Sequence, residues 1–115
     1  MNIEKVRLYC LKKEFVTESF PFNEVTLVFK VMNKIFCLAI LTPPHLINLK
    51  CDPELAVELR EKYEAVSPGY HMNKTHWNTI MLDGSIPDKL IKSWIDHSYD
   101  LIVKSMPQKD SKKFK

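Results

Sequence analysis

Glycine and arginine are scarce in this sequence, with two residues of each type among 115. The chain has no glycine-rich loop that could cradle a phosphate, no nucleophile elbow and no pair of catalytic carboxylates. We therefore expect a protein that is not an enzyme and that needs no cofactor. Arginine, at positions 7 and 60 only, would contribute little to a phosphate-binding surface.

Cysteines are few and widely spaced, and long apolar runs are absent. Cys10, Cys37 and Cys51 form no CxxC pair, which argues against a disulfide framework or a zinc ribbon. Each lies in or beside an apolar run, so we expect three buried thiols. Pro43 and Pro44 break the longest apolar stretch well short of the roughly 20 residues that span a bilayer. Because the N-terminus also lacks an apolar signal core, we expect a cytoplasmic protein with no membrane partner.

The positive charge is concentrated at one end of the chain. The net charge is +3, and residues 107–115 alone carry four lysines and one aspartate, so residues 1–106 are neutral. The length and the 45% hydrophobic content are typical of one globular domain. We therefore predict a single domain over residues 1–106 and a basic, disordered tail over residues 107–115.

Capping residues and hydrophobic periodicity predict the secondary structure. Helices are expected from Asn2 to about Lys13, after the Asp52 cap, and between Pro87 and Pro107. Strands are expected at 26–31, 34–41 and 46–51, the first two joined by a tight turn or a wider loop at Met32 and Asn33. In the third strand, Asn48 and Lys50 would point away from the core. Adjacent strands flanked by helices favour an α+β domain, an antiparallel sheet with helices packed on one face.

The stretch PGYHMNKTHWNTIML, residues 68–82, holds an unusual concentration of polar and aromatic side chains. We predict a hairpin with a two-residue turn at Asn73 and Lys74, although a single helical turn fits the same residues. The hairpin would set Tyr70 opposite Trp77 on one face and His71 opposite His76 on the other.

Four interpretations of this cluster are open. The two histidines could begin a metal site, but no third ligand lies close in sequence. His71 or His76 could form an acid–base pair with Asp96 or His97. Asn73, Lys74 and His76 could contact phosphates, with an exposed aromatic ring stacking on a base. Alternatively, the aromatic residues pack in the core and Asn73 makes the turn.

Four blocks of the sequence closely resemble the MmcQ/YjbR family of small bacterial proteins. They are FPFNEVTLVFKV, INLKCDPELA, PGYHMNKTHWNT and IPDKLIKSWIDHSYDLIV, and they follow the family's order from about Asn2 to Met106. The resemblance implies a frataxin-like α+β fold with protruding hairpins, called a double wing, that bind DNA. At the positions that match the family blocks, the resemblance suggests the following DNA contacts: Lys50, His71, Asn73, Lys74, His76, Trp77 and Asn78.

We accordingly expect a DNA-binding protein that contacts the phosphate backbone through Lys34, Lys50 and Lys74, helped by the tail lysines. A small-ligand or anion-binding module is the alternative, with Asn48, Lys50, His71 and His76 lining a pocket. A protein-interaction domain is a third possibility. We expect a monomer or a weak dimer, and the sequence indicates no metal site.

Overall fold

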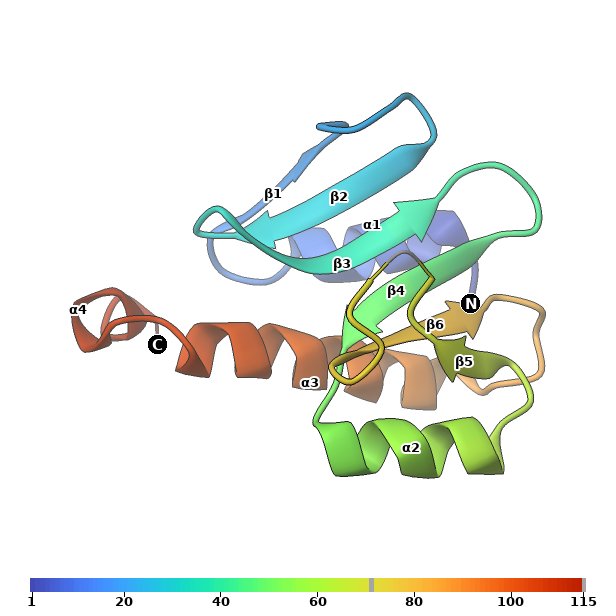
Figure 1. Ribbon diagram of the computed structural model, residues 1–115. Helices are drawn as coiled ribbons and strands as arrows, with labels where there is room; N and C mark the ends of the chain where they lie inside the picture. Colours follow the sequence, from blue (N-terminus) through green and yellow to red (C-terminus); the bar gives the residue numbers. More distant parts are fainter. Residues whose placement is uncertain (71, 115) are drawn as a thin grey trace.

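The structure is a computed structural model that describes residues 1–70 and 72–114 (Figure 1). Its elements, in chain order, are α1 (Ile3–Leu11), β1 (Val16–Ser19), β2 (Thr26–Val31), β3 (Lys34–Ile40), β4 (Leu46–Lys50), α2 (Pro53–Lys62), β5 (Val66–Pro68), β6 (Trp77–Met81), α3 (Asp88–Lys104) and α4 (Gln108–Ser111). The strands form one antiparallel sheet in the order β1-β2-β3-β4-β6-β5. The predicted α+β fold is confirmed.

The hydrophobic core lies between the sheet and the helices. Figure 1 shows α1 and α3 behind the sheet, whereas no helix crosses its front. Alternate strand residues such as Phe29, Ile47 and Ile80 are buried against helix residues such as Val6 and Ile95. In the part of the chain that the structure describes, loops rather than helices cross the front, which leaves this face available for a site.

Local capping explains where the first two helices begin. The Oδ1 atom of Asn2 accepts the N–H of Lys5 at 2.8 Å, and a carboxylate oxygen of Asp52 accepts the N–H of Leu55 at 3.3 Å. These side chains satisfy N–H groups that have no partner within the helix. Both predicted caps are confirmed.

A two-residue turn joins β2 to β3. Met32 and Asn33 have φ values of 47° and 70°, so both adopt the left-handed conformation that a tight hairpin turn requires. The tight turn predicted from the sequence is therefore present, with a methionine at a position that usually favours glycine or asparagine.

Strand β1 was not predicted. It is a four-residue edge strand, and the Arg7 guanidinium on α1 binds its Glu18 carboxylate through two hydrogen bonds of 2.8 Å. Chiefly through this bonding, Arg7 lowers the pKa of Glu18 below its usual value. A strand of four residues is too short to show a reliable alternation of apolar and polar side chains. The partner of Glu18 lies on another element, α1, so the residues around Glu18 do not indicate this bond.

The predicted pairing of Tyr70 with Trp77 is wrong. The ladder between β5 and β6 ends at Pro68 opposite Asn78, followed by a bond of 2.8 Å from the Gly69 N–H to the Trp77 carbonyl. The Tyr70 N–H then turns toward Thr79 and donates to its Oγ1 at 3.0 Å, which ends the strand. The described residues between β5 and β6, 69–70 and 72–76, belong to no strand, and this connection is called here the front loop. His71, the other half of the predicted histidine pair, lies outside the described residues.

The C-terminal segment differs from the disordered tail that we expected. Residues 108–111 form the short helix α4, and the ring of Phe114 packs edge-on against Phe15 and Tyr99, with ring centroids 5.2 and 6.1 Å apart. A lone aromatic residue among lysines gives little sequence signal, because the two rings that it contacts are distant in the chain.

The three cysteines are buried and free, as predicted. Cys37 is completely enclosed and hydrogen-bonded with Cys10, which together with burial raises the pKa of the Cys37 thiol well above its ordinary value. Within residues 1–70 and 72–114, no helix combines the length and hydropathy needed to cross a membrane.

Candidate ligand pocket

One row of side chains crosses the front face of the sheet. Paired positions place Val28 beside Leu38, Leu38 beside Asn48, and Asn48 beside Thr79. All four are at most 6% exposed although no helix covers them. As predicted, Asn48 lies on the face of the sheet that points away from the helices. Its side chain is nevertheless buried. Loops must therefore cover the front of the sheet.

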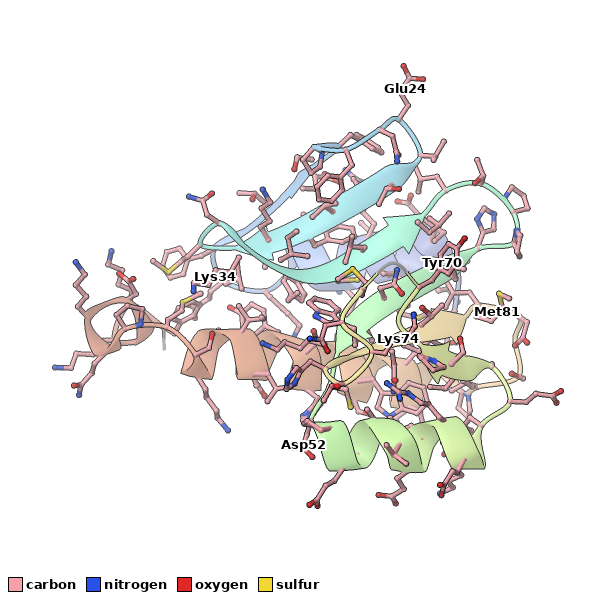
Figure 2. All side chains as sticks on the ribbon, viewed as in Figure 1. Glu24, Lys34, Asp52, Tyr70, Lys74 and Met81 are labelled. Atoms are coloured by element: carbon pink, nitrogen blue, oxygen red, sulfur yellow. The ribbon has the colours of Figure 1, made fainter. Side chains whose placement is uncertain are left out.

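The covering loops enclose a pocket of about 530 Å³ on this row. Its floor comes from β2, β3 and β4, and its walls from the β1–β2 loop, the β3–β4 loop and the front loop; the lining residues are Phe22, Asn23, Thr26, Leu38, Ile40, Thr42, Pro43, Pro44, Leu46, Asn48, Tyr70 and Met72. Figure 2 shows Tyr70 on the front loop, across the sheet from the helices. None of the described lining residues carries a formal charge at neutral pH.

A short hydrogen-bond chain fixes the polar part of the floor. The Tyr70 N–H donates to Thr79 Oγ1 at 3.0 Å, and the Thr79 hydroxyl donates to Asn48 Oδ1 at 2.5 Å. Among the described residues, none accepts a hydrogen bond from Nδ2 of Asn48, and none has a fully buried side-chain polar atom without a partner. Nδ2 of Asn48 is therefore not fully buried. Since Asn48 lines the pocket, this amide group is accessible to a ligand there.

Arg60 on α2 holds the front loop in place. Its Nε donates to Asn78 Oδ1 at 2.6 Å, while its Nη2 donates to the carbonyl of Trp77 at 3.2 Å and to the carbonyl of Lys74. A guanidinium is suited to this role because its donors form a rigid fork. We did not predict a role for Arg60, and the only signal in the sequence is that arginine is rare.

The predicted DNA contacts come from several elements. Lys34 is exposed in the β2–β3 hairpin, whereas Lys50 and Trp77 are half-buried and opposite each other on β4 and β6. His76 is exposed at the end of the front loop. Lys34 therefore lies at the start of β3, and the other three lie where β4, β6 and the front loop meet.

The remaining candidates have structural partners. Asn73 Oδ1 accepts the N–H groups of Thr75 and His76, so Asn73 makes the turn. Lys74 Nζ donates to the carbonyl of Gly69 at 3.2 Å. Asn78 is 2% exposed and binds Arg60 and the carbonyl of Ala56, which leaves it no surface for a DNA contact. His71 is not among the described residues.

Asp96 and His97 are also occupied by other partners. Asp96 accepts from Lys13 at 2.5 Å and from Tyr9 at 2.7 Å, so it faces α1 rather than the front loop. Burial and, secondarily, the Asp96 bond raise the pKa of Tyr9 to about 12. His97 Nε2 accepts the N–H of Asp52 at 3.1 Å. In the described residues, Asp96 and His97 make these hydrogen bonds with partners other than His76.

Metal binding has no support in the described part of the chain. Residues 1–70 and 72–114 contain no group of three or more histidine, cysteine, aspartate or glutamate side chains placed to hold an ion. The pocket, with its mostly apolar lining and the oriented amides of Asn48 and Asn23, is therefore the most developed candidate site.

An antiparallel sheet with helices on one face and a loop-covered pocket on the other defines a small α+β domain. Residues 11–101 match the YjbR family model. The chain is 34% identical to the uncharacterized protein YjbR of Escherichia coli K12 over 97% of this chain and 96% of that protein. The chain therefore belongs to the YjbR family.

Solved structures and a shorter match agree with this family. A Deinococcus radiodurans protein, DR2400, is 36% identical and has a TM-score of 0.91 over 97% of this chain and 86% of its own. A Pseudomonas syringae protein is 31% identical, with a TM-score of 0.78 over 88% of this chain and 98% of its own. Uncharacterized protein YyaQ of Bacillus subtilis is 43% identical over 49% of this chain and 47% of that protein.

Proposed function

We propose that the protein binds a small, uncharged ligand in the front pocket and does not catalyse a reaction on it. The observation that carries this proposal is the 530 Å³ cavity with mostly apolar lining and with the amide of Asn48 on its floor available for hydrogen bonding. Ligand pockets are typically about 300–1,000 Å³, apolar, with a few fixed polar groups. Of the four residues expected to line a pocket, Asn48 lines this one, whereas Lys50 and His76 do not. The fourth, His71, lies outside the described residues.

The lining favours binding over catalysis and over anions. Its described residues include no histidine, cysteine, lysine or carboxylate that could transfer a proton near neutral pH or serve as a nucleophile. An anion would lose its hydration without gaining a charged partner among the described lining residues, and this cost opposes binding. The proposal is therefore for a neutral ligand.

Ligand-observed NMR with a library of small neutral fragments tests this function. Leu46 is half-buried on the pocket floor, so Leu46→Trp should fill the cavity and abolish fragment binding. Val57, 50% exposed on α2, is not a pocket residue; Val57→Trp is the matched control and should leave binding unchanged. Failure of the whole library to bind the wild-type protein, or equal binding to both variants, would contradict the proposal.

DNA binding is the second candidate function. It is favoured by the packing of Phe114 on Tyr99, which holds the lysine-rich C-terminal segment against the body instead of leaving it free. Lys34 and Lys50 are the other cations that we expect to contact phosphates. Binding of this kind would be independent of sequence and would weaken steeply as salt rises.

Fluorescence anisotropy with labelled duplex and single-stranded DNA at low salt tests this second function. The Lys34→Glu, Lys50→Glu double variant and removal of residues 107–115 should each weaken binding. Lys89, exposed at the start of α3, provides a charge-reversal control in Lys89→Glu. No binding by the wild-type protein, or equal weakening by the control, would exclude the proposed DNA contacts.

A further inference from the structure

We propose that the front pocket selects a flat aromatic ligand that carries a neutral hydrogen-bond acceptor, such as a ring carbonyl, and that Asn48 Nδ2 donates to it. This inference rests on the proposed ligand-binding function and specifies its ligand class. It depends on two features, the orientation of the Asn48 amide and the aromatic character of the walls.

The orientation of the Asn48 amide follows from the hydrogen of the Thr79 hydroxyl. Thr79 Oγ1 already accepts the N–H of Tyr70, and its own hydrogen requires an acceptor. Asn48 Oδ1 is that acceptor, at 2.5 Å. If the amide were reversed, two donors would face each other unless the hydroxyl found another acceptor. Thr79 is therefore a positioning residue that presents the NH₂ group, rather than the oxygen, to the pocket.

A donor on the floor discriminates between ligands. A ligand acceptor gains a hydrogen bond from Nδ2, whereas an apolar group placed there leaves this amide without its water and without a partner. A hydrogen-bond donor of the ligand at the same point would face Nδ2, which is also a donor, and would find no acceptor there. The floor therefore favours an acceptor over either alternative.

The walls favour a flat, unsaturated body. Phe22 from the β1–β2 loop and Tyr70 from the front loop line the same cavity and are 63% and 67% exposed, respectively. Large exposed aromatic side chains beside a cavity offer ring faces and edges to a bound ring. Pro43 and Pro44 add a compact apolar wall. No described lining residue carries an opposite charge, so an ionised acceptor is disfavoured.

Three small molecules with one skeleton separate these contributions. 1-Indanone has a ring carbonyl, indane lacks it, and indane-2-carboxylate carries a charge. Side-chain amide signals in ¹⁵N-labelled wild-type protein report both affinity and contact with Asn48. We expect 1-indanone to bind about fivefold more tightly than indane, corresponding to one net hydrogen bond, and the carboxylate to bind least. Only 1-indanone should shift the Asn48 NH₂ signals.

Variants of Thr79 test the positioning role. Thr79→Ser keeps the hydroxyl and should retain the preference for the ketone. Thr79→Val should abolish this preference, so that 1-indanone and indane bind with about equal affinity. Asn48→Leu should also abolish the preference while indane still binds. If either variant fails to fold, the wild-type comparison of ketone with hydrocarbon still decides the proposal.

Each outcome has a distinct meaning. Equal binding of 1-indanone and indane, or a preference for the carboxylate, overturns the inference; if Leu46→Trp still abolishes their binding, the proposed ligand-binding function stands. A ketone preference with shifted Asn48 signals that survives Thr79→Val supports the ligand class and overturns the positioning role. Failure of all three molecules and of the neutral fragment library overturns both the inference and the proposed function.

Discussion

Arg60 on α2 donates from Nε to Oδ1 of the buried Asn78 on β6 across 2.6 Å. The same guanidinium binds two carbonyls at the end of the front loop, so one side chain connects a helix, a strand and a wall of the pocket. We expect Arg60→Ala to lower the free energy of unfolding by about 2 kcal/mol, since it leaves these acceptors without a charged donor. Urea denaturation measures this change.

A double-mutant cycle with Asn78→Ala separates the pair from the rest of the network. We expect a coupling of about 1 kcal/mol between the two positions, because the residues are in direct contact. Arg60→Ala should also weaken fragment binding by releasing the front loop. Additive effects on unfolding, with unchanged fragment affinity, would show that Arg60 does not hold the loop.

The two glycines are required for different reasons. Gly69 lies too close to Trp77 for a side chain, and Gly84 has a backbone conformation that favours glycine. A Cβ atom at Gly69 would lie 2.8 Å from the Cβ of Trp77, closer than van der Waals contact allows. Gly84 has a φ of +85° with open space around it. We expect Gly69→Ala to cost about 1–3 kcal/mol through overpacking, and Gly84→Ala about 1 kcal/mol through backbone strain.

The two glycine substitutions differ in what they disturb. Gly69→Ala should move the indole NMR signal of Trp77, because the added methyl group displaces this side chain. Gly84→Ala should leave that signal in place. A matching change of the Trp77 signal in both variants would contradict the steric explanation.

The bond between Arg7 and Glu18 makes stability depend on pH. Arg7 lowers the pKa of Glu18 in the folded protein, so the stabilisation is fully present above the unfolded value of about 4.3 and is lost as pH falls through the lower folded pKa. We expect Glu18→Gln to destabilise at pH 7, with a difference from the wild-type protein that shrinks below about pH 4. Thermal unfolding at both pH values measures it. A difference that grows in acid would contradict this sign.

Phe114 contributes to the environment of Tyr99. Burial, with smaller contributions from the charges of Glu14 and Asp100, raises the pKa of Tyr99 to about 12. Phe114→Ala should expose this ring and lower its pKa toward the ordinary value of about 10. Tyrosine ring signals followed by NMR against pH measure the shift.

Tyr9 provides the internal reference for that titration, since its pKa is also about 12 but depends on burial and Asp96. Lys112→Ala should leave both tyrosines unchanged. An unchanged pKa of Tyr99 in Phe114→Ala would mean that the C-terminal segment does not cover this ring in solution.

Local signals in the sequence were sufficient for most of the fold. Asn2 and Asp52 are caps that act on N–H groups three residues away, so their effect can be read from neighbouring residues. The Met32 and Asn33 turn is likewise set by strand spacing and by the two residues themselves. The hairpin at 66–82 was harder to predict from local signals, because Tyr70 leaves the strand ladder and its N–H donates to Thr79, nine residues away.

By itself, the sequence determined the α+β class, the helix starts, the buried thiols and the family. These properties depend on local caps, hydrophobic periodicity and blocks of residues that stay together in the chain. Only the tertiary structure decided that Asn48 meets Thr79, 31 positions away, and that Arg60 meets Asn78, 18 positions away. The pocket depends on these contacts, since strand order and loop closure bring its floor and walls together from three separate parts of the chain: residues 22–26, residues 38–48, and Tyr70 with Met72.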